Sequence, residues 1–227
     1  MENLIQKLSF IDSTELVRDA AWQMAVDEAI LRLGLDVTVR FYQWERRTIS
    51  FGYFLKRSEI ASVADRFGEI EWVRRWTGGG VVDHDGDVPY SIIVPAESEF
   101  FKLRPTETYR FIHRALVASL RAHGIPAELV NEEQGAGLAC FEHPVPSDVL
   151  LMGKKIAGAG QRRTRLGMLH QGTIQGVSVK LVPEWRLDFA KSLAREVEET
   201  TLAPAVEALA DQLRAEKYAT EGWLNLR

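Results

Sequence analysis

Apolar residues at helical spacing predict several helices along the chain. These helices cover residues 19–32, 58–66, 184–196 and 203–217, and a longer segment that begins at Pro105 and ends at Gly124. In the first helix, Trp22, Val26 and Ile30 fall on one side, while Asp27 and Glu28 lie between them.

Short runs of β-branched and aromatic residues predict strands between these helices. They cover residues 38–44, 48–54, 70–75, 88–94, 126–131, 149–152, 155–161 and 168–177. Strands and helices mixed in this order predict an α+β fold, with a mixed or largely antiparallel sheet flanked by helices. A length of 227 residues, without a linker or a repeat, predicts a single domain over residues 1–227.

Charge and composition exclude several classes of function. The formal net charge is −4, so we expect no nucleic-acid partner. The one dense basic run, Arg162 to Arg165, is interpreted as a solvated hairpin tip, with a site for an acidic partner or a phosphate as the alternative. No apolar stretch of about 18 residues is present, so we expect no membrane partner. The single cysteine fits a reducing compartment, and the first residues lack a signal-peptide pattern. These features predict a cytoplasmic protein.

A glycine-rich segment from Arg74 to Asp85 is the first candidate for chemistry. It contains Thr77, Gly78, Gly79, Gly80 and His84. Glycines let a ligand lie against the backbone, whose N–H groups can hold a carbonyl or a phosphate. The spacing is neither that of a P-loop nor that of a dinucleotide fingerprint, and a tight bulge between strands is the alternative interpretation.

A second candidate is the predicted strand around Lys155, in which small residues alternate. Gly158 and Ala159 leave room for a slender group such as an acyl chain to pass over the strand. A hairpin with solvent-facing lysines is the alternative interpretation. Cys140 lies about 15 residues earlier, in a segment rich in glycine and proline. It is interpreted either as a thiolate nucleophile stabilised by the nearby ammonium or as a small buried apolar side chain.

The histidines give a weaker signal. His170 lies in a predicted apolar strand with Gly172 and Thr173, where it is either hydrogen-bonded in the core or lines a pocket. His113 and His123 on the long helix are expected at the surface. The histidines and the cysteine show no metal-ligand spacing, so no metal site is predicted.

Together and in this order, these segments resemble the biotin/lipoate A/B protein ligase superfamily. Arg74 to Asp85 is similar to its Arg-Arg-x-Ser/Thr-Gly-Gly-Gly segment with the following His-Asp. Lys154 to Gln161 is similar to its Lys-Ile/Val-x-Gly-Ser-Ala-Gln segment, with Lys155 in the place of the family lysine. His170 to Thr173 resembles its His-Gly-Thr/Ser strand, and Met24 to Ala29 resembles its early helix. The resemblance implies the class II biotin/lipoyl synthetase-like catalytic fold.

Members of this superfamily divide by chemistry. Octanoyltransferases move octanoate from acyl carrier protein, through a cysteine thioester, to a lysine of a lipoyl domain or of the glycine-cleavage H protein, with no cofactor. One branch carries Ala-Cys-Phe ahead of the lysine motif, as Ala139-Cys140-Phe141 does here, so the resemblance implies this activity. The main alternative is a lipoate–protein ligase that uses ATP and magnesium and acts through lipoyl-AMP. An amidotransferase, a biotin ligase and a non-catalytic binding module stay open as further alternatives.

The resemblance also implies a set of site residues. Cys140 is the expected nucleophile, and Lys155 is expected to hold the acyl carbonyl or to favour the thiolate. The residues expected to bind substrate are Arg74, Thr77, Gly78, Gly79, Gly80, His84, Gly158, Ala159, His170, Gly172 and Thr173.

Overall fold

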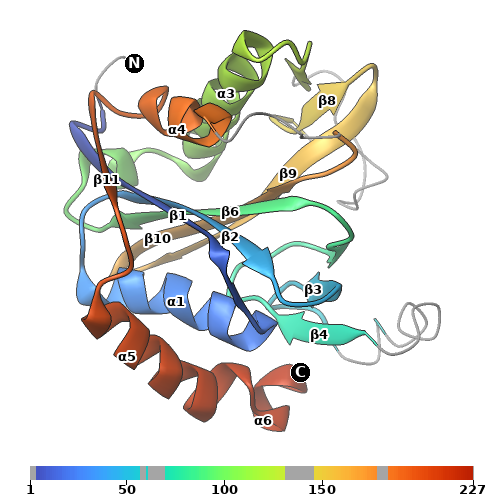
Figure 1. Cartoon of the computed structure of the whole chain (residues 1–227), viewed down its shortest axis with the longest axis vertical. Coiled ribbons are helices and arrows are strands. Elements are labelled where there is room, and N and C mark those ends of the chain that lie inside the picture. Colours follow the sequence, from blue (N-terminus) through green and yellow to red (C-terminus); the bar gives the residue numbers. More distant parts are fainter. Residues whose placement is uncertain (1–3, 57–59, 61–69, 131–145, 178–183, 227) are drawn as a thin grey trace.

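The computed structural model describes residues 4–56, 60, 70–130, 146–177 and 184–226. Its centre is an eight-stranded sheet with the order β11-β1-β2-β6-β10-β9-β8-β7 (Figure 1). The strands are β1 (Lys7–Arg18), β2 (Thr38–Trp44), β6 (Val88–Pro95), β7 (Glu128–Leu129), β8 (Val149–Leu151), β9 (Lys154–Thr164), β10 (Gly167–Ile174) and β11 (Glu196–Thr200). The pairs β11–β1 and β1–β2 are parallel, and the other neighbours are antiparallel. The predicted α+β fold with a mixed, largely antiparallel sheet is confirmed.

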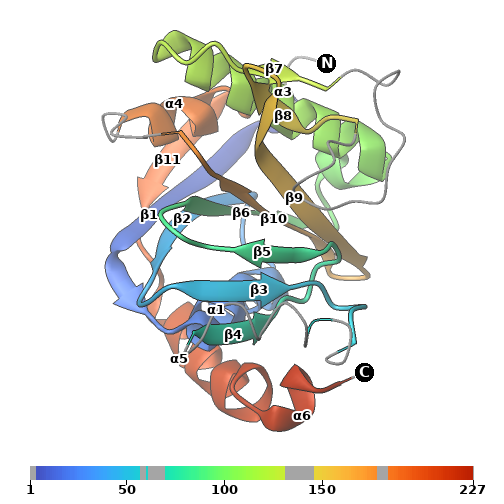
Figure 2. The same cartoon turned by 90° about the vertical axis from the view of Figure 1, so that its right-hand side faces the viewer.

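A second sheet of three strands lies beside the large one. It has the order β4-β3-β5 and consists of β3 (Thr48–Phe51), β4 (Glu71–Arg74) and β5 (Val81–Asp83) (Figure 2). Although only three polar residues separate β2 from β3, the two strands belong to different sheets. The glycine-rich loop connects β4 to β5, and this arrangement brings the loop to the side of β9 and β10.

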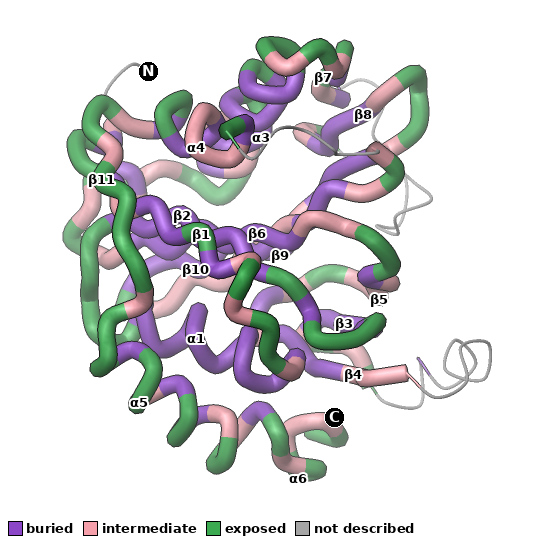
Figure 3. Tube along the Cα trace, viewed as in Figure 1, coloured by how far each residue is buried: buried purple, intermediate pink, exposed green. Residues whose placement is uncertain are grey.

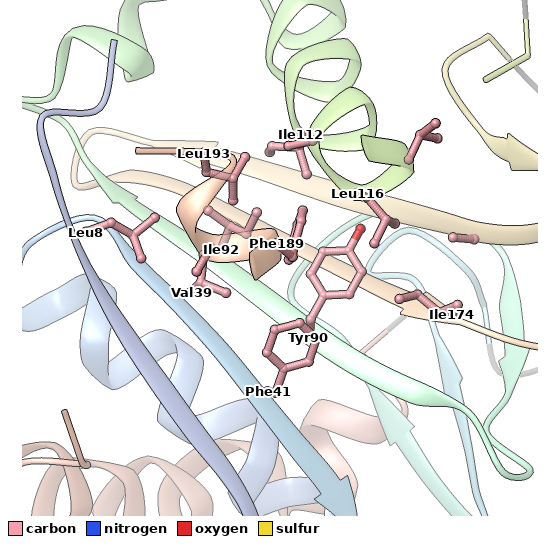
Figure 4. Close-up of a cluster of buried hydrophobic side chains, with 14 of the residues drawn as sticks. Leu8, Val39, Phe41, Tyr90, Ile92, Ile112, Leu116, Ile174, Phe189 and Leu193 are labelled. Atoms are coloured by element: carbon pink, nitrogen blue, oxygen red, sulfur yellow. The ribbon is translucent and has the colours of Figure 1, made fainter. Parts of the chain in front are cut away.

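Helices cover both faces of the large sheet (Figure 1). The helices are α1 (Ala20–Leu33), α3 (Pro105–Ala122), α4 (Glu184–Lys191), α5 (Pro204–Leu213) and α6 (Glu221–Leu224), with a 3-10 turn over Glu99–Lys102 and a π-helical turn over Arg214–Tyr218. On the α3–α4 face, Phe41, Tyr90, Ile112, Leu116 and Phe189 form part of one core cluster (Figure 4). Helix α1 packs between the sheet and α5 in a second cluster. None of the helices in the described part of the chain is both long and apolar enough to span a bilayer.

Because α1 is buried on all sides, its two acidic residues also lie in the interior (Figure 3). Asp27 and Glu28 are fully buried. Asp27 lies 2.9 Å from the guanidinium of Arg40, and Glu28 accepts hydrogen bonds from Tyr218 and Lys217 at 2.5 Å. Buried charges require such partners, so the pair fixes α1 against both the sheet and the C-terminal segment.

Three strands were not predicted from the sequence. These are β1, β5 and β11, and β11 carries almost no buried residue that would mark it. The helix predicted over 184–196 was too long, since α4 ends at Lys191 and Glu196 already begins β11. The helix predicted over 58–66 lies outside the described residues, apart from Ile60.

Candidate functional site

A cavity of about 100 Å³ lies between the two sheets. Several of the expected site residues line it. They are Gly79, Gly80, His84, Lys155, Gly158, Ala159, Gly172 and Thr173. Tyr42, Trp44, Ser50, Arg75, Val81, Val82, Asp148, Gly160 and Gln171 complete the lining. A second cavity adjoins the first and shares Gly79, Asp148, Ala159 and Gly160 with it.

Lys155 supplies a positive charge to the cavity wall. Its Nζ lies 2.7 Å from Oδ2 of Asp148, and the two side chains are 9% and 6% exposed. Asp148 directly precedes β8. The tight turn between β8 and β9 places Met152 and Gly153 at positive φ. That two-residue hairpin fixes the register of the strands. The lysine side chain is therefore held against Asp148 in the cavity wall, and the interpretation of a solvent-facing lysine is wrong for Lys155.

Gly158 makes room for this lysine. A Cβ at position 158 would lie 2.8 Å from Cε and 3.0 Å from Nζ of Lys155, and 3.2 Å from Oδ1 of Asp148. Any larger residue would thus displace the ammonium or its carboxylate.

The glycine loop packs directly against β9 and against Gly52, the residue that follows β3. A Cβ at Gly160 of β9 would be 2.5 Å from the carbonyl oxygen of Gly78, and one at Gly52 would be 2.0 Å from that of Gly79. Gly79 has a φ of +103°, which favours glycine. Thr77 donates to Oε1 of Gln171 at 2.9 Å and is fully buried. The loop is thus anchored between β3 and the large sheet.

Arg75 braces the same loop from inside. Its guanidinium donates to the carbonyls of Gly78 and Gly80 at 3.3 and 3.0 Å, and to Oγ of Ser50 at 2.6 Å. Burial lowers the pKa of Arg75 to about 10, so the side chain stays charged at neutral pH. The cavity therefore has a second fixed positive charge.

His84 lies in a chain of buried polar groups. Its Nε2 is 2.5 Å from Oγ of Ser50, and its Nδ1 pairs with Oδ2 of Asp87. Thr173 also donates to that carboxylate oxygen. The ring of Trp44 lies 4.6 Å from the imidazole, centroid to centroid. These contacts fix the position of the imidazole in the cavity wall.

Three expected site residues in the described part of the chain do not line either cavity, namely Thr77, Arg74 and His170. Arg74 is fully buried and donates to the carbonyls of Tyr53 and Leu55 at 2.9 and 2.7 Å, and to those of Trp223 and Leu224 at 2.9 Å. It therefore ties β4 to the C-terminal helix.

His170 is the last of the three residues. Its Nδ1 pairs with Nε2 of Gln161 at 3.1 Å, and its ring packs between those of Tyr90, Tyr109 and His113. Burial lowers the pKa of both histidines. His113, expected at the surface, is fully buried, and that expectation was wrong.

The basic run differs from its sequence interpretation. Arg162 lies over the rings of Tyr53 and Trp76 at 4.5 and 5.0 Å, and Arg163 lies over that of Phe101 at 4.6 Å. Only Arg165 and the next residue are exposed at the hairpin tip. The first two arginines are packing residues, because their guanidinium groups lie over aromatic rings.

Cys140 lies outside the described residues, so its position relative to Lys155 stays a prediction. In the described part of the chain, no group of three or more histidine, aspartate or glutamate side chains has a metal-binding arrangement.

Sequence reasoning missed Ser50, Asp87 and Asp148 as members of the site. Asp87 follows His84 by three residues, a spacing that a turn brings together and that was available as a signal. Ser50 and Asp148 reach the cavity only through the packing of separate strands, and no local pattern marks them.

The chain matches the family model of the lipoyl protein ligase A/B catalytic domain over residues 19–213. With this match and the fold described above, the chain belongs to that family, which confirms the superfamily inferred from the sequence motifs.

Particular relatives narrow the comparison. The chain is 31% identical to octanoyltransferase LipM of Brevibacillus brevis, over 91% of this chain and 95% of the relative. It is 34% identical to octanoyltransferase LipM of Staphylococcus aureus, over 69% of this chain and 62% of that one. Among solved structures, a putative lipoate protein ligase from T. acidophilum with bound lipoic acid superposes with a TM-score of 0.77, at 25% identity and 98% coverage of both chains. A lipoate-protein ligase A bound with ATP gives 0.71, also at 25% identity, covering 96% of this chain and 98% of that one.

Proposed function

We propose that this protein is an octanoyltransferase of protein lipoylation, with residues 1–227 acting as a single catalytic domain. Similarity to LipM octanoyltransferases over nearly the whole chain carries the proposal. The buried ammonium of Lys155 in a glycine-lined cavity supports it, because acyl transfer needs a positive charge where the carbonyl oxygen becomes negative.

The first step of the proposed reaction forms an acyl-enzyme. The thiolate of Cys140 attacks the carbonyl carbon of an octanoyl thioester on acyl carrier protein, and the carrier thiolate leaves. Cys140 precedes Asp148 by eight positions, a length of chain that can extend over ~28 Å, so the connection allows the thiol to reach the cavity. Lys155 would donate to the developing oxyanion, a contribution of roughly 3–4 kcal/mol by analogy with one oxyanion-hole donor.

The second step transfers the acyl group to protein. The amine of a lysine on a lipoyl domain or on the glycine-cleavage H protein attacks the thioester, and the Cys140 thiolate leaves. The first step exchanges one thioester for another and is nearly balanced, whereas the second forms an amide and runs downhill. The thioester donor therefore replaces ATP, and the proposed reaction needs no cofactor. The partners are proteins and not nucleic acid or membrane.

A lipoate–protein ligase acting through lipoyl-AMP is the second candidate. The similarity to a lipoate-protein ligase A bound with ATP favours it. It would require ATP and magnesium, and it would not require Cys140.

Product formation with two donors separates the two candidates. We expect octanoyl-lysine to form from octanoyl carrier protein without ATP, and Cys140→Ala to lose it. Product that forms only from lipoate, ATP and magnesium, with Cys140→Ala as active as the parent chain, would replace the transferase by the ligase. A parallel assay with octanoylated H protein as donor tests the amidotransferase.

A further inference from the structure

Ser50, His84 and Asp87 form a chain of hydrogen bonds that ends in the cavity. Ser50 and His84 line the cavity, and Asp87 lies behind them with a side chain that is 1% exposed. The sequence order places Ser50 on β3 and the other two in the β5–β6 turn, so the small sheet and its neighbour assemble the chain.

The donors around Ser50 determine where its proton lies. Arg75 has only N–H donors and points one at Oγ of Ser50 at 2.6 Å. The hydroxyl proton of Ser50 is then left for Nε2 of His84, at 2.5 Å. The carboxylate of Asp87 accepts from Nδ1 of His84, an arrangement that leaves Nε2 facing the Ser50 hydroxyl.

A second lone pair of Ser50 Oγ remains available to a ligand. A hydroxyl has two acceptor positions, and Arg75 uses one of them. Ser50 lines the cavity although the residue itself is fully buried, so a group that carries an N–H would have to enter the cavity to donate to the other position.

Lys155 does not provide this acceptor. Its Nζ is paired with the Asp148 carboxylate at 2.7 Å, and an ammonium can donate but cannot accept a proton. His84 is the histidine that lines the cavity among the described residues. The two walls thus offer complementary chemistry, a proton donor on the large sheet and a proton acceptor on the small one.

We propose that Ser50, His84 and Asp87 accept the proton of the acceptor lysine in the second transfer step, an inference that rests on the proposed function. The uncharged amine attacks the thioester carbon, the new C–N bond forms, and the carbonyl electron pair moves to oxygen. The amine proton passes to Ser50 Oγ while the Ser50 hydroxyl proton passes to His84 Nε2. When the intermediate collapses, the C–S bond breaks, and the released thiolate takes up the proton from the imidazolium.

The same three residues have the arrangement of a nucleophilic serine triad, but the surroundings favour the relay. The guanidinium of Arg75 occupies an electron pair of Ser50 Oγ, which makes that oxygen a weaker nucleophile. We therefore expect no acyl transfer to Ser50, and the Cys140→Ala variants below would detect it.

Separate measurement of the two half-reactions tests the relay. Octanoyl carrier protein is mixed with His84→Gln, Ser50→Ala or the parent chain, and the acyl-enzyme is followed by intact-protein mass. The isolated acyl-enzyme is then mixed with H protein or with hydroxylamine, a small nucleophile that is uncharged at neutral pH. The matched control is His123→Gln, because His123 also pairs with a carboxylate, that of Asp188 at 2.8 Å, and does not line the cavity.

The relay predicts that the two variants slow the second transfer step and leave the first step nearly unchanged. Acyl-enzyme formation and hydroxylamine release should stay within about threefold of the parent, while transfer to H protein should fall on the order of 100-fold in both variants, the usual range for a lost general base. Imidazole added to His84→Ala should restore part of the transfer. The control should change neither step.

Three results overturn the relay. They are transfer by His84→Gln and Ser50→Ala within threefold of the parent, a parallel loss of all three rates, and an octanoyl group that stays on the protein in Cys140→Ala but not in Cys140→Ala with Ser50→Ala. A parent chain that forms no acyl-enzyme instead contradicts the proposed function. If His84→Gln does not fold, the Ser50→Ala result decides.

Discussion

The ammonium of Lys155 reaches the carboxylate of Asp148 across the β8–β9 hairpin, with 2.7 Å between Nζ and Oδ2. The space for that contact exists because residue 158 has no side chain. A charge held in this way is already oriented before any acyl group arrives, which is the arrangement that stabilises a developing oxyanion best.

Gly158→Ala should separate activity from stability. Position 158 is not at positive φ, so the backbone tolerates alanine. Because Lys155 shifts without losing its carboxylate, the free energy of unfolding should fall by less than the ~3 kcal/mol expected when that carboxylate is removed. The added Cβ displaces the lysine Nζ, so octanoyl transfer should fall at least about tenfold, given the cost of misplacing a positioned group. Gly222→Ala, with no atom closer than 3.9 Å, is the control. Full activity of Gly158→Ala would show that the lysine position is unimportant.

Asp148→Asn should destabilise the fold. It leaves the buried ammonium of Lys155 without its carboxylate, and breaking such a pair costs about 3 kcal/mol. Adding Lys155→Met removes the uncompensated charge, so the double variant should regain much of the stability but none of the activity. Urea unfolding and the transfer assay measure the two effects. Equal stability of Asp148→Asn and the parent chain would mean that the pair contributes little.

Arg74→Lys should affect stability and leave catalysis intact. Arg74 donates to four backbone carbonyls, and a lysine cannot reproduce that planar pattern. We expect a loss of roughly 2 kcal/mol in the free energy of unfolding. The transfer rate at a temperature well below the midpoint should stay within twofold. Arg165→Lys at the exposed hairpin tip is the control. A transfer rate that falls without a loss of stability would return Arg74 to the substrate-binding residues.

Two buried histidines predict a dependence of stability on pH. Burial lowers the pKa of His113 and of His170 below the ordinary 6.5, so both are neutral in the folded protein while the unfolded chain takes up protons. Stability is therefore complete above about pH 6.5 and is lost as the pH falls below it, by up to about 1.4 kcal/mol per pH unit for each histidine. Urea unfolding at pH 7.5, 6.5 and 5.5 measures this slope.

His113→Asn should roughly halve that slope, because one of the two proton acceptors is gone. A slope that is unchanged in His113→Asn, or absent in the parent chain, would assign the pH dependence to other groups.

The periodicity of apolar residues was sufficient to predict much of the fold. The apolar spacing of α1 and α3 and the β-branched runs of β2, β6 and β10 predicted those elements, because each packs a continuous face into the core. Strand β11 is an edge strand whose residues are nearly all exposed, so its sequence carries no alternation. Its pairing with β1 depends on tertiary context, which a local pattern does not contain.

The candidate site, like the fold, was predicted only in part. The glycines and the lysine in family-like segments identified one wall of the cavity, since segments that another group approaches closely are rich in glycine. The partners of the charged groups were not predicted from the sequence. The contacts of Lys155 with Asp148 and of His84 with Ser50 depend on which strands pair. Within the basic run, Arg162 and Arg163 were misjudged, because aromatic rings from distant segments lie under their guanidinium groups, whereas Arg165 is exposed at the tip as predicted.

Transfer through Cys140 is tested by the mass of the intact chain after mixing with octanoyl carrier protein, without ATP. We expect a gain of one octanoyl group that hydroxylamine removes and that Cys140→Ala does not acquire. No gain on the parent chain, or an equal gain on Cys140→Ala, would contradict transfer through the cysteine.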